Sequence, residues 1–256
     1  MQPAVEITGL RHRFADAQQE TLNLPELTIE AGEKVALIGT SGAGKSTLLR
    51  LLDGRLRGWR GAVSVLGVDL VSDHAPRREH RRRTGFIFQE FALIEQASVF
   101  RNVLNGRLGR MAVWPSLVGR HSAADAGLVA AALDDTGMTE FAARRAERLS
   151  GGQRQRVAIA RCLVQEPELM LADEPIASLD PVNAKTILST LVNSAARRGA
   201  ALILSSHQPQ LVADYVDRFV ALESGAVVFD GPADDFGASE FSHVYGESTG
   251  ERAAAS

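Results

Sequence analysis

The chain has 256 residues, of which 45% are hydrophobic, 23% charged and 5% aromatic. This length suits one large α/β domain or two small ones, and the apolar content excludes intrinsic disorder for most of the chain. The net charge of −3 argues against a protein that as a whole neutralises a nucleic-acid backbone. The single cysteine, Cys162, rules out an intrachain disulfide and fits a reducing compartment.

No export signal or membrane-spanning segment is visible in the sequence. Residues 1–10 lack a basic region followed by a long apolar run, so they do not resemble a secretory signal. The longest uncharged apolar stretches, 128–133 and 200–204, are far shorter than the roughly 20 residues that a spanning helix needs. We therefore expect a cytosolic chain, which only a partner would hold at a membrane.

Short β-prone runs bounded by turn residues dominate the first third of the chain. The expected strands are 5–10, 22–29, 34–39, 62–66 and 85–88. The run 35–38 is wholly apolar and ends in Gly39, which is typical of a strand buried on both faces. An apolar helical stretch at 47–52 follows it.

The pattern changes twice in the rest of the chain. Residues 98–148 are rich in Ala and Arg with helical spacing, and we interpret them as a helical insert. The final third alternates strands with helices, which predicts a largely parallel sheet with helices on both faces. The expected strands are 169–172, 201–205, 216–222 and 226–229, and the expected helices begin at Gln153, after Pro181 and after Pro209. We expect the small, polar residues 246–256 to form a disordered tail.

A phosphate-binding loop is the strongest motif. Residues 39–46 satisfy the pattern Gly-x4-Gly-Lys-Ser/Thr between an apolar strand and a helix. Glycines let the backbone turn its N–H groups inward, which forms an anion nest at a helix N-terminus. Lys45 can reach the β- and γ-phosphates of a nucleotide, and the Ser46 hydroxyl can ligate Mg²⁺. The expected nucleotide-binding residues are Gly39, Thr40, Ser41, Gly42, Ala43, Gly44, Lys45, Ser46 and Thr47.

Two carboxylates end the apolar run 169–172. In a parallel sheet this is the carboxyl edge, where ligands bind. We expect Asp173 to hold Mg²⁺ beside Ser46, directly or through water, and Glu174 to polarise the water that attacks the γ-phosphate. Without the phosphate loop, the same residues would be interpreted as a strand that runs into an acidic turn.

Further segments resemble the motifs of the ATP-binding cassette (ABC) ATPases, in the family's order. The segment Leu149-Ser150-Gly151-Gly152-Gln153 is similar to the family signature. Gln89 resembles the Q-loop glutamine, Ser178-Leu179-Asp180 the D-loop and His207 the switch histidine. Phe14 lies where the family has its adenine-stacking aromatic residue, although that residue is more often Tyr. The resemblance covers residues 5–231 and includes every catalytic element.

This resemblance implies one ABC ATPase domain over residues 1–245. It would combine a mostly parallel P-loop sheet, an antiparallel β subdomain and a helical subdomain inserted at about 90–160. The implied cofactors are ATP and Mg²⁺, with Ser46, Gln89 and Asp173 as metal ligands. The implied catalytic residues are Glu174, Gln89 and His207.

The signature residues would act on a second copy of the chain. Ser150, Gly151 and Gly152 open a helix, and the N–H groups and dipole of a helix N-terminus can bind a γ-phosphate. Because Lys45 already holds a phosphate within its own subunit, the family resemblance implies that the signature, with Gln153 and Asp180, contacts ATP held by a partner copy. ATP would then join two subunits, and hydrolysis would release them.

Finer similarities indicate one kind of cassette. The segments 102–110, 114–119 and 171–180 resemble the phosphonate-importer ATPases, although Asn105 and the end of the chain after Gly231 depart from them. This resemblance implies an ATPase for import of phosphonate or a related phosphorus oxyanion, at the cytoplasmic face of the membrane. The implied partners are two transmembrane permease subunits and an extracytoplasmic solute-binding protein, without nucleic acid.

Three alternatives remain open at this point. The alternatives are the ATPase of an importer for another solute, a soluble ABC ATPase acting on nucleic acid or ribosomes, and an ATPase of carbon–phosphorus lyase machinery. Soluble members usually have two cassettes or a long coiled coil, whereas this chain has one phosphate loop and only 60 residues between Gln89 and Ser150. That comparison favours the importer.

Two other segments have competing interpretations. Residues 77–83 contain five arginines, which could contact nucleic acid or lipid headgroups, but a solvated face is the preferred interpretation. The apolar segment 91–100 after Gln89 is either core or a groove for a coupling helix of the permease, and the groove is preferred. Cys162 is expected to be a small packing residue.

Overall fold

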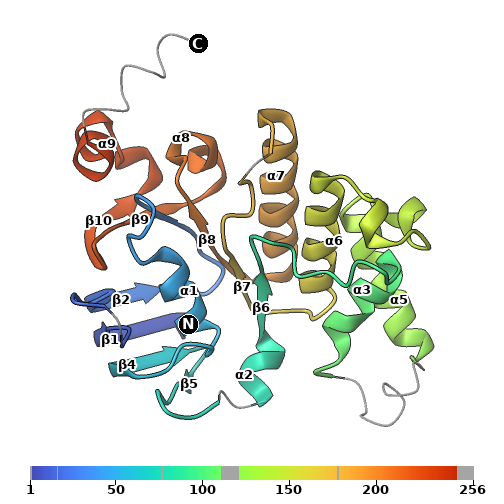
Figure 1. Cartoon of the computed structure of the whole chain (residues 1–256), viewed down its shortest axis with the longest axis horizontal. Coiled ribbons are helices and arrows are strands. Elements are labelled where there is room, and N and C mark those ends of the chain that lie inside the picture. The colour runs from blue at the N-terminus through green and yellow to red at the C-terminus, as the bar shows by residue number, and fades with distance from the viewer. Residues whose placement is uncertain (1, 16, 76–77, 111–120, 178, 247–256) are drawn as a thin grey trace.

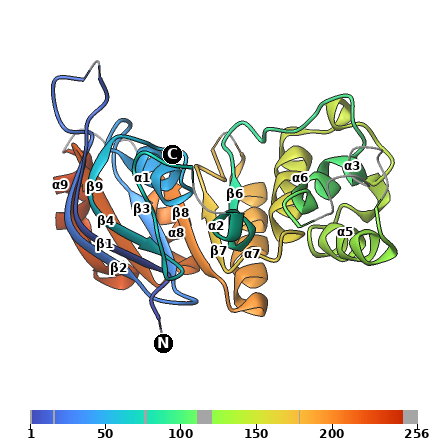
Figure 2. The same ribbon diagram turned by 90° about the horizontal axis from the view of Figure 1, so that it is seen from below.

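The computed structural model describes the chain except for residues 1, 16, 76–77, 111–120, 178 and 247–256. Within the described residues the strands form two sheets, one of four strands and one of six. Both sheets lie on one side of the molecule and most of the inserted helices on the other, as two perpendicular views show (Figures 1 and 2).

The smaller sheet is antiparallel, with the order β2–β1–β4–β5. Its strands are β1 (Val5–His12), β2 (Leu22–Ile29), β4 (Trp59–Val65) and β5 (Val68–Asp69). Val5 of the central strand β1 pairs with Ile29 on one side and with Val65 on the other. Strand β1 runs two residues further than expected, because its pairing with β2 continues to His12 and Leu22.

The larger sheet has the order β10–β9–β3–β8–β7–β6. Its strands are β3 (Lys34–Ile38), β6 (Thr84–Ile87), β7 (Leu169–Ala172), β8 (Ala201–Ser206), β9 (Arg218–Glu223) and β10 (Ala226–Pro232). Pairing is parallel from β9 through β6, and only the edge strand β10 is antiparallel. The prediction of a mostly parallel sheet with an antiparallel β subdomain is confirmed. The carboxyl ends of β3, β7 and β8 therefore lie side by side.

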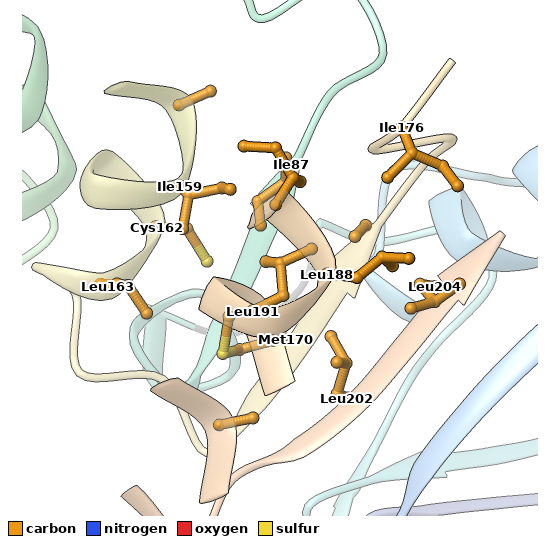
Figure 3. Close-up of a cluster of buried hydrophobic side chains, with 14 of the residues drawn as sticks. Ile87, Ile159, Cys162, Leu163, Met170, Ile176, Leu188, Leu191, Leu202 and Leu204 are labelled. Atoms are coloured by element: carbon orange, nitrogen blue, oxygen red, sulfur yellow. The ribbon is translucent and has the colours of Figure 1, made fainter. Parts of the chain in front are cut away.

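The larger sheet is buried on both faces except along its edge strand β10. Successive residues of β3 point into different apolar clusters, Ala36 and Ile38 into one and Val35 and Leu37 into the other. The first cluster packs against the helical side of the sheet, where Figure 3 shows Cys162, Leu163 and Leu191 among its members. Cys162 is 1% exposed, and burial raises the pKa of its thiol to about 12, as expected for a packing residue.

Several of the described helices begin at a residue whose side chain caps the helix. The main ones are α1 (Lys45–Leu52), α3 (Val99–Leu104), α5 (Ala123–Asp135), α6 (Gly151–Leu163), α7 (Pro181–Arg198) and α9 (Ala238–Tyr245). Helix α7 has Asp180 as its N-cap, Pro181 at its first position and Gly199 in a left-handed conformation at its end. The predicted helical insert is observed as α3 and α5, followed by α6. Its segment 114–119 lies outside the described residues.

Two parts of the chain differ from the sequence-based expectations. Helix α9 was not expected; it starts where the Gly237 N–H donates to Glu240 Oε2 over 3.0 Å. The solvated face expected at 77–83 is observed at Arg78, Glu79 and Arg81, which are exposed, but not at His80 or Arg83, and Arg77 lies outside the described residues. On α2 (Arg78–Arg83) His80 is only 1% exposed, and Arg83 donates from Nε and Nη2 to the two carboxylate oxygens of Glu168 at 2.7 and 2.8 Å.

Candidate nucleotide site

The phosphate loop follows β3 at the edge where the parallel strands end. Gly39 adopts φ +139°, and a Cβ on it would lie 2.2 Å from the carbonyl oxygen of Leu222. Only glycine fits such a close approach of two backbones. Gly44, at φ +106°, is the N-cap of α1, so the loop ends at the positive end of this helix.

Lys45 closes the loop on itself. Lys45 is 5% exposed, and its ammonium group donates to the carbonyl oxygens of Gly39 and Thr40 at 2.7 and 2.9 Å. Burial lowers the pKa of Lys45, and the nearby carboxylates of Glu174 and Asp173 oppose that shift. The amine thus lies between the loop backbone and two acidic side chains, where a bound phosphate would strengthen its charged form.

Ser46 and Asp173 meet across the strand ends. The Ser46 hydroxyl donates to Asp173 Oδ1 over 2.8 Å, although 127 residues separate the two in sequence. A second serine, Ser205 at the end of β8, donates to the same oxygen over 2.8 Å. Asp173 is 5% exposed, so its carboxylate is held almost entirely by these protein donors.

Glu174 is the centre of a second group of polar side chains. Its backbone N–H donates to Ser205 Oγ over 2.8 Å, and its Oε2 accepts from Gln89 Nε2 over 3.4 Å. His207 Nδ1 lies 3.7 Å from the same Oε2. The structure therefore brings together the three side chains predicted to be catalytic, which come from the ends of three different strands.

Phe14 lies on the loop between β1 and β2, which passes beside the phosphate loop. The carbonyl oxygen of Thr21 lies 2.9 Å from the position of a Cβ on Gly44. Phe14 is 40% exposed and makes an edge contact with the ring of His12, with 4.7 Å between centroids. Phe14 is thus a partly exposed aromatic residue on a loop whose other end, at Thr21, adjoins the phosphate loop.

The predicted signature residues form a well-made helix start. Ser150 is the N-cap of α6: its Oγ accepts from the Gln153 N–H at 3.3 Å, and Gln153 Oε1 accepts from the Ser150 N–H at 3.0 Å. A Cβ on Gly152 would lie 3.7 Å from Asn183 Oδ1, on the first turn of α7. Gly151 has open space around its Cβ position.

The signature and the phosphate loop of one chain lie apart. In both views α6 is on the far side of β6 and β7 from α1 (Figures 1 and 2). Asp180, beside the signature, is engaged locally, since its carboxylate accepts from the N–H groups of Val182 and Asn183 at 3.1 and 3.0 Å. Hydrogen bonding from the Asn183 side chain lowers the pKa of Asp180. Ser178 of the same motif is outside the described residues.

Sequence reasoning missed two residues that contact this site. Ser205 connects Asp173 and Glu174, and Tyr245 of α9 contacts Gly39. A polar Ser-Ser pair at the end of the apolar run 201–204 was the available signal for Ser205. No local pattern pointed to Tyr245, because 206 residues separate it from Gly39.

The fold and site define a P-loop nucleoside triphosphatase: a glycine-rich loop after a parallel strand, with paired carboxylates at the end of a second strand. A family model described as "ABC transporter" matches residues 22–177. The chain belongs to this family and is an ATP-binding, ATP-hydrolysing cassette.

Curated relatives are similar over nearly the whole chain. The chain is 40% identical to a phosphonates import ATP-binding protein, PhnC, of Alcaligenes faecalis over 94% of its length and 88% of the relative's. It is 44% identical to PhnC 1 of Rhodopseudomonas palustris strain HaA2 over 95% of its length and 86% of the relative's.

Solved structures agree with the fold. The cbiO1 protein of Clostridium perfringens, part of the cbiONQ ABC transporter complex, superposes with a TM-score of 0.80 at 27% identity, covering 95% of this chain and 94% of its own. The dimeric ATP-binding cassette MJ0796, bound to ADP and phosphate, has a TM-score of 0.77 at 27% identity, covering 90% of this chain and 98% of its own. Among the residues that the structure describes, no helix combines the length and apolar character needed to cross a membrane.

Proposed function

We propose that this chain is the ATPase subunit of an importer for phosphonate or a related phosphorus oxyanion. The observation that carries the proposal is the similarity, at 40–44% identity over most of the chain, to proteins named as phosphonate-import ATP-binding subunits. The subunit would act at the cytoplasmic face of the membrane, held there by partners. The transported solute does not enter the nucleotide site, so the solute assignment rests on this similarity alone.

Nucleotide binding falls to the phosphate loop and Phe14 in this proposal. The backbone N–H groups of residues 39–47 would surround the phosphates, and Lys45 would exchange its contacts with Gly39 and Thr40 for phosphate oxygens. Phe14 would stack on the adenine ring, since it is a partly exposed aromatic residue on the β1–β2 loop, whose Thr21 adjoins the phosphate loop.

Glu174, Gln89 and His207 would carry out ATP hydrolysis. Glu174 would accept the proton of the attacking water, while Gln89 and His207, both within 4 Å of its Oε2, would orient the water and the γ-phosphate. The shared Oε2 supports this division, because one carboxylate oxygen already faces both neighbours. Phosphoryl transfer relies mainly on such positioning and on charge stabilisation.

The residues also fit Mg²⁺. Ser46 Oγ and Asp173 Oδ1 lie 2.8 Å apart, and hydroxyl and carboxylate oxygens are the ligands that this ion prefers. Gln89 would supply a further oxygen from its amide. When bound with ATP, the ion neutralises charge that develops on the β- and γ-phosphates. Ser205 would keep Asp173 aimed at this position through its 2.8 Å hydrogen bond.

The signature residues would complete the site of a second copy. Ser150, Gly151, Gly152 and Gln153 lie at the start of α6, far from the phosphate loop of their own chain. A helix start carries unpaired N–H groups and positive potential, which suits a γ-phosphate presented by another subunit. Asp180 adjoins the signature through Asn183 and would lie in the same interface.

A groove between the sheet and α6 is the proposed docking place for a helix of the permease. Its volume is about 340 Å³, and its lining includes Arg55, Phe86, Phe88 and Arg161. The Arg55 guanidinium lies 4.3 Å from the ring centroid of Phe88. Arg161 donates to the carbonyl oxygen of Phe91 over 2.7 Å, so the segment after Gln89 borders the groove.

In the segment 91–100 some residues belong to the core and others are exposed, so each of the two interpretations holds for part of it. Val99 is fully buried and Leu93 packs against the core, whereas Ile94 is 54% exposed. Ile94 is therefore the better probe of docking. Ile94→Asp should leave folding and the ATPase activity of the free subunit intact but abolish co-purification with the permease. Val228→Asp is the matched control, because Val228 is 36% exposed on β10, at the opposite edge of the sheet.

The complete proposal is tested by reconstitution with two permease subunits and an extracytoplasmic binding protein. Methylphosphonate and the binding protein together should stimulate ATP hydrolysis, whereas sulfate, maltose and RNA should not. Stimulation by another solute would overturn the solute assignment but keep the importer. Stimulation by RNA or ribosomes without permease would favour the soluble alternative.

A further inference from the structure

The last described helix reaches back to the first residue of the phosphate loop. The Gly39 N–H donates to the hydroxyl oxygen of Tyr245, with 3.1 Å between N and Oη. Tyr245 ends α9 and lies outside residues 22–177, the part that the family model matches. The contact therefore connects the nucleotide site to a part of the chain outside that match.

Gly39 depends on an acceptor from outside the sheet. Strand β3 ends at Ile38, which is the last residue paired with β8 and β9. The next N–H, on Gly39, is therefore beyond the ladder, and a buried N–H without an acceptor is costly. The close approach to the Leu222 carbonyl excludes any side chain on Gly39 itself. The Tyr245 hydroxyl supplies the acceptor that the sheet does not.

Gly39 also holds Lys45. Its carbonyl oxygen accepts from Lys45 Nζ over 2.7 Å, while its N–H donates to Tyr245. One residue thus connects the hydroxyl of α9 with the lysine expected to bind phosphate. A displacement of Gly39 would move both the mouth of the loop and the resting place of the ammonium group.

Helix α9 is built to keep the hydroxyl in place. Val244 is 4% exposed, and the rings of Phe241 and Tyr245 stack with 4.8 Å between centroids and 27° between planes. Burial raises the pKa of Tyr245, so the phenol stays neutral across the physiological range. In Figure 1 the helix lies next to the end of the sheet formed by β9 and β10.

We propose that Tyr245 is a positioning residue for nucleotide binding: its hydroxyl fixes Gly39, and Gly39 sets the geometry in which the loop and Lys45 receive the phosphates. The inference rests on ATP binding by this loop and is independent of the transported solute. It assigns to α9 a part in setting the affinity for ATP rather than the rate of the chemical step.

Tyr245→Phe tests the proposal because it removes only the hydroxyl. We expect the KM for ATP of the free subunit to rise about five-fold, the size of one lost hydrogen bond, with kcat changed less than about two-fold. The affinity for a fluorescent ATP analogue should fall by the same factor. Tyr215→Phe is the matched control, since the chain has two tyrosines and Tyr215 packs against the core.

Amide hydrogen exchange supplies a second measurement that depends on the contact itself. In Tyr245→Phe the Gly39 amide should exchange faster, while the amides of Val35–Leu37 in β3 exchange at the wild-type rate and the melting temperature falls by no more than about 2–4 °C, the effect of one lost hydrogen bond. Unchanged KM and unchanged Gly39 exchange would overturn the proposal. So would a general loss, in which kcat, KM and melting temperature change together, because that pattern marks a merely structural tyrosine.

Discussion

Ser205 accepts a hydrogen bond from the backbone N–H of Glu174, with 2.8 Å between Oγ and N. The same hydroxyl donates to Asp173 Oδ1, so one side chain of β8 fixes two adjacent acidic residues after β7. Glu174 needs such support because its φ of +45° lies in the left-handed region, which non-glycine residues seldom adopt. The serine thus stabilises a strained backbone at the reactive end of the sheet.

Ser205→Ala should impair catalysis more than binding. The change removes the acceptor of the Glu174 N–H and one donor to Asp173, so both carboxylates lose their fixed direction. We expect kcat to fall about ten-fold, with the KM for ATP changed less than about three-fold. Ser206→Ala is the control, because the Ser206 hydroxyl accepts from Gln208 and contacts neither carboxylate. A wild-type kcat in Ser205→Ala would refute the positioning role.

Glu174→Gln should separate ATP binding from hydrolysis. The amide has nearly the shape of the carboxylate but cannot take a proton from water, so hydrolysis should fall by about 10²-fold or more. The variant should accumulate as an ATP-bound dimer, measurable by size-exclusion chromatography with ATP. Turnover at the wild-type rate would remove Glu174 from this role.

Lys45→Ala and Ser150→Arg should damage the two halves of one ATP site, which we propose come from different subunits. Lys45→Ala deletes the charge that pairs with the phosphates and should weaken ATP binding by the monomer. Ser150→Arg should leave monomer binding intact but abolish turnover, because we propose that the signature serves the opposite subunit. An equimolar mixture should restore at most one working site per dimer.

Ser150→Ala controls for helix capping in that experiment. It removes the hydroxyl that accepts from Gln153, at a cost of about 1 kcal/mol, without adding bulk at the interface. It should therefore keep more turnover than Ser150→Arg. If Ser150→Arg alone abolished ATP binding by the monomer, action of the signature on a second subunit would be the wrong model.

Phe14→Ala should raise the ATP concentration needed for half-maximal activity several-fold. The loss corresponds to a stacking contribution on the order of 1 kcal/mol, because the half-exposed ring offers area but no hydrogen bond. Phe14→Tyr should be nearly neutral. If the stack is selective for adenine, Phe14→Ala should raise the half-maximal concentration of GTP less than that of ATP. Unchanged ATP dependence in Phe14→Ala would assign the stack to another residue.

Asp53 should make stability depend on pH in an unusual direction. Burial raises the pKa of this carboxyl from 3.8 to about 6, although the nearby Arg55 opposes the shift. The native state then binds more protons than the unfolded state between these values, so this group's contribution to stability falls as pH rises from about 4 to about 6. The shift of about two units corresponds to a few kcal/mol, on the order of 2–3.

Asp53→Asn removes that titration. The unfolding free energy of the variant minus that of the wild type should increase between pH 4 and pH 6 and stay level above pH 6. Urea denaturation at several pH values measures this difference. A difference independent of pH would show that the carboxyl titrates in the native state at its ordinary pKa.

Local patterns predicted the parts of the fold that local physics decides. The strands 22–29 and 169–172 match their predicted bounds, because turn residues and apolar runs delimit them sharply. The phosphate loop was predictable because its backbone conformation requires glycines at fixed positions. Helix α9 was missed, since its stability comes from Val244 packing on a distant cluster. His80 was missed for the same reason: its burial on an Arg-rich helix depends on tertiary packing.

Helix α6 connects the signature to the segment after Gln89. Its 13 residues span about 20 Å, with Gly151 at one end and Arg161 near the other. Arg161 donates to the carbonyl oxygens of Phe91 and Ala92, two and three residues after Gln89. The helix has no proline or glycine after Gly152, so we expect it to move as one rigid body. If ATP held by a partner copy is drawn to one end, as proposed, the helix would shift the backbone beside the proposed permease groove at the other, with no need for a relay of side chains.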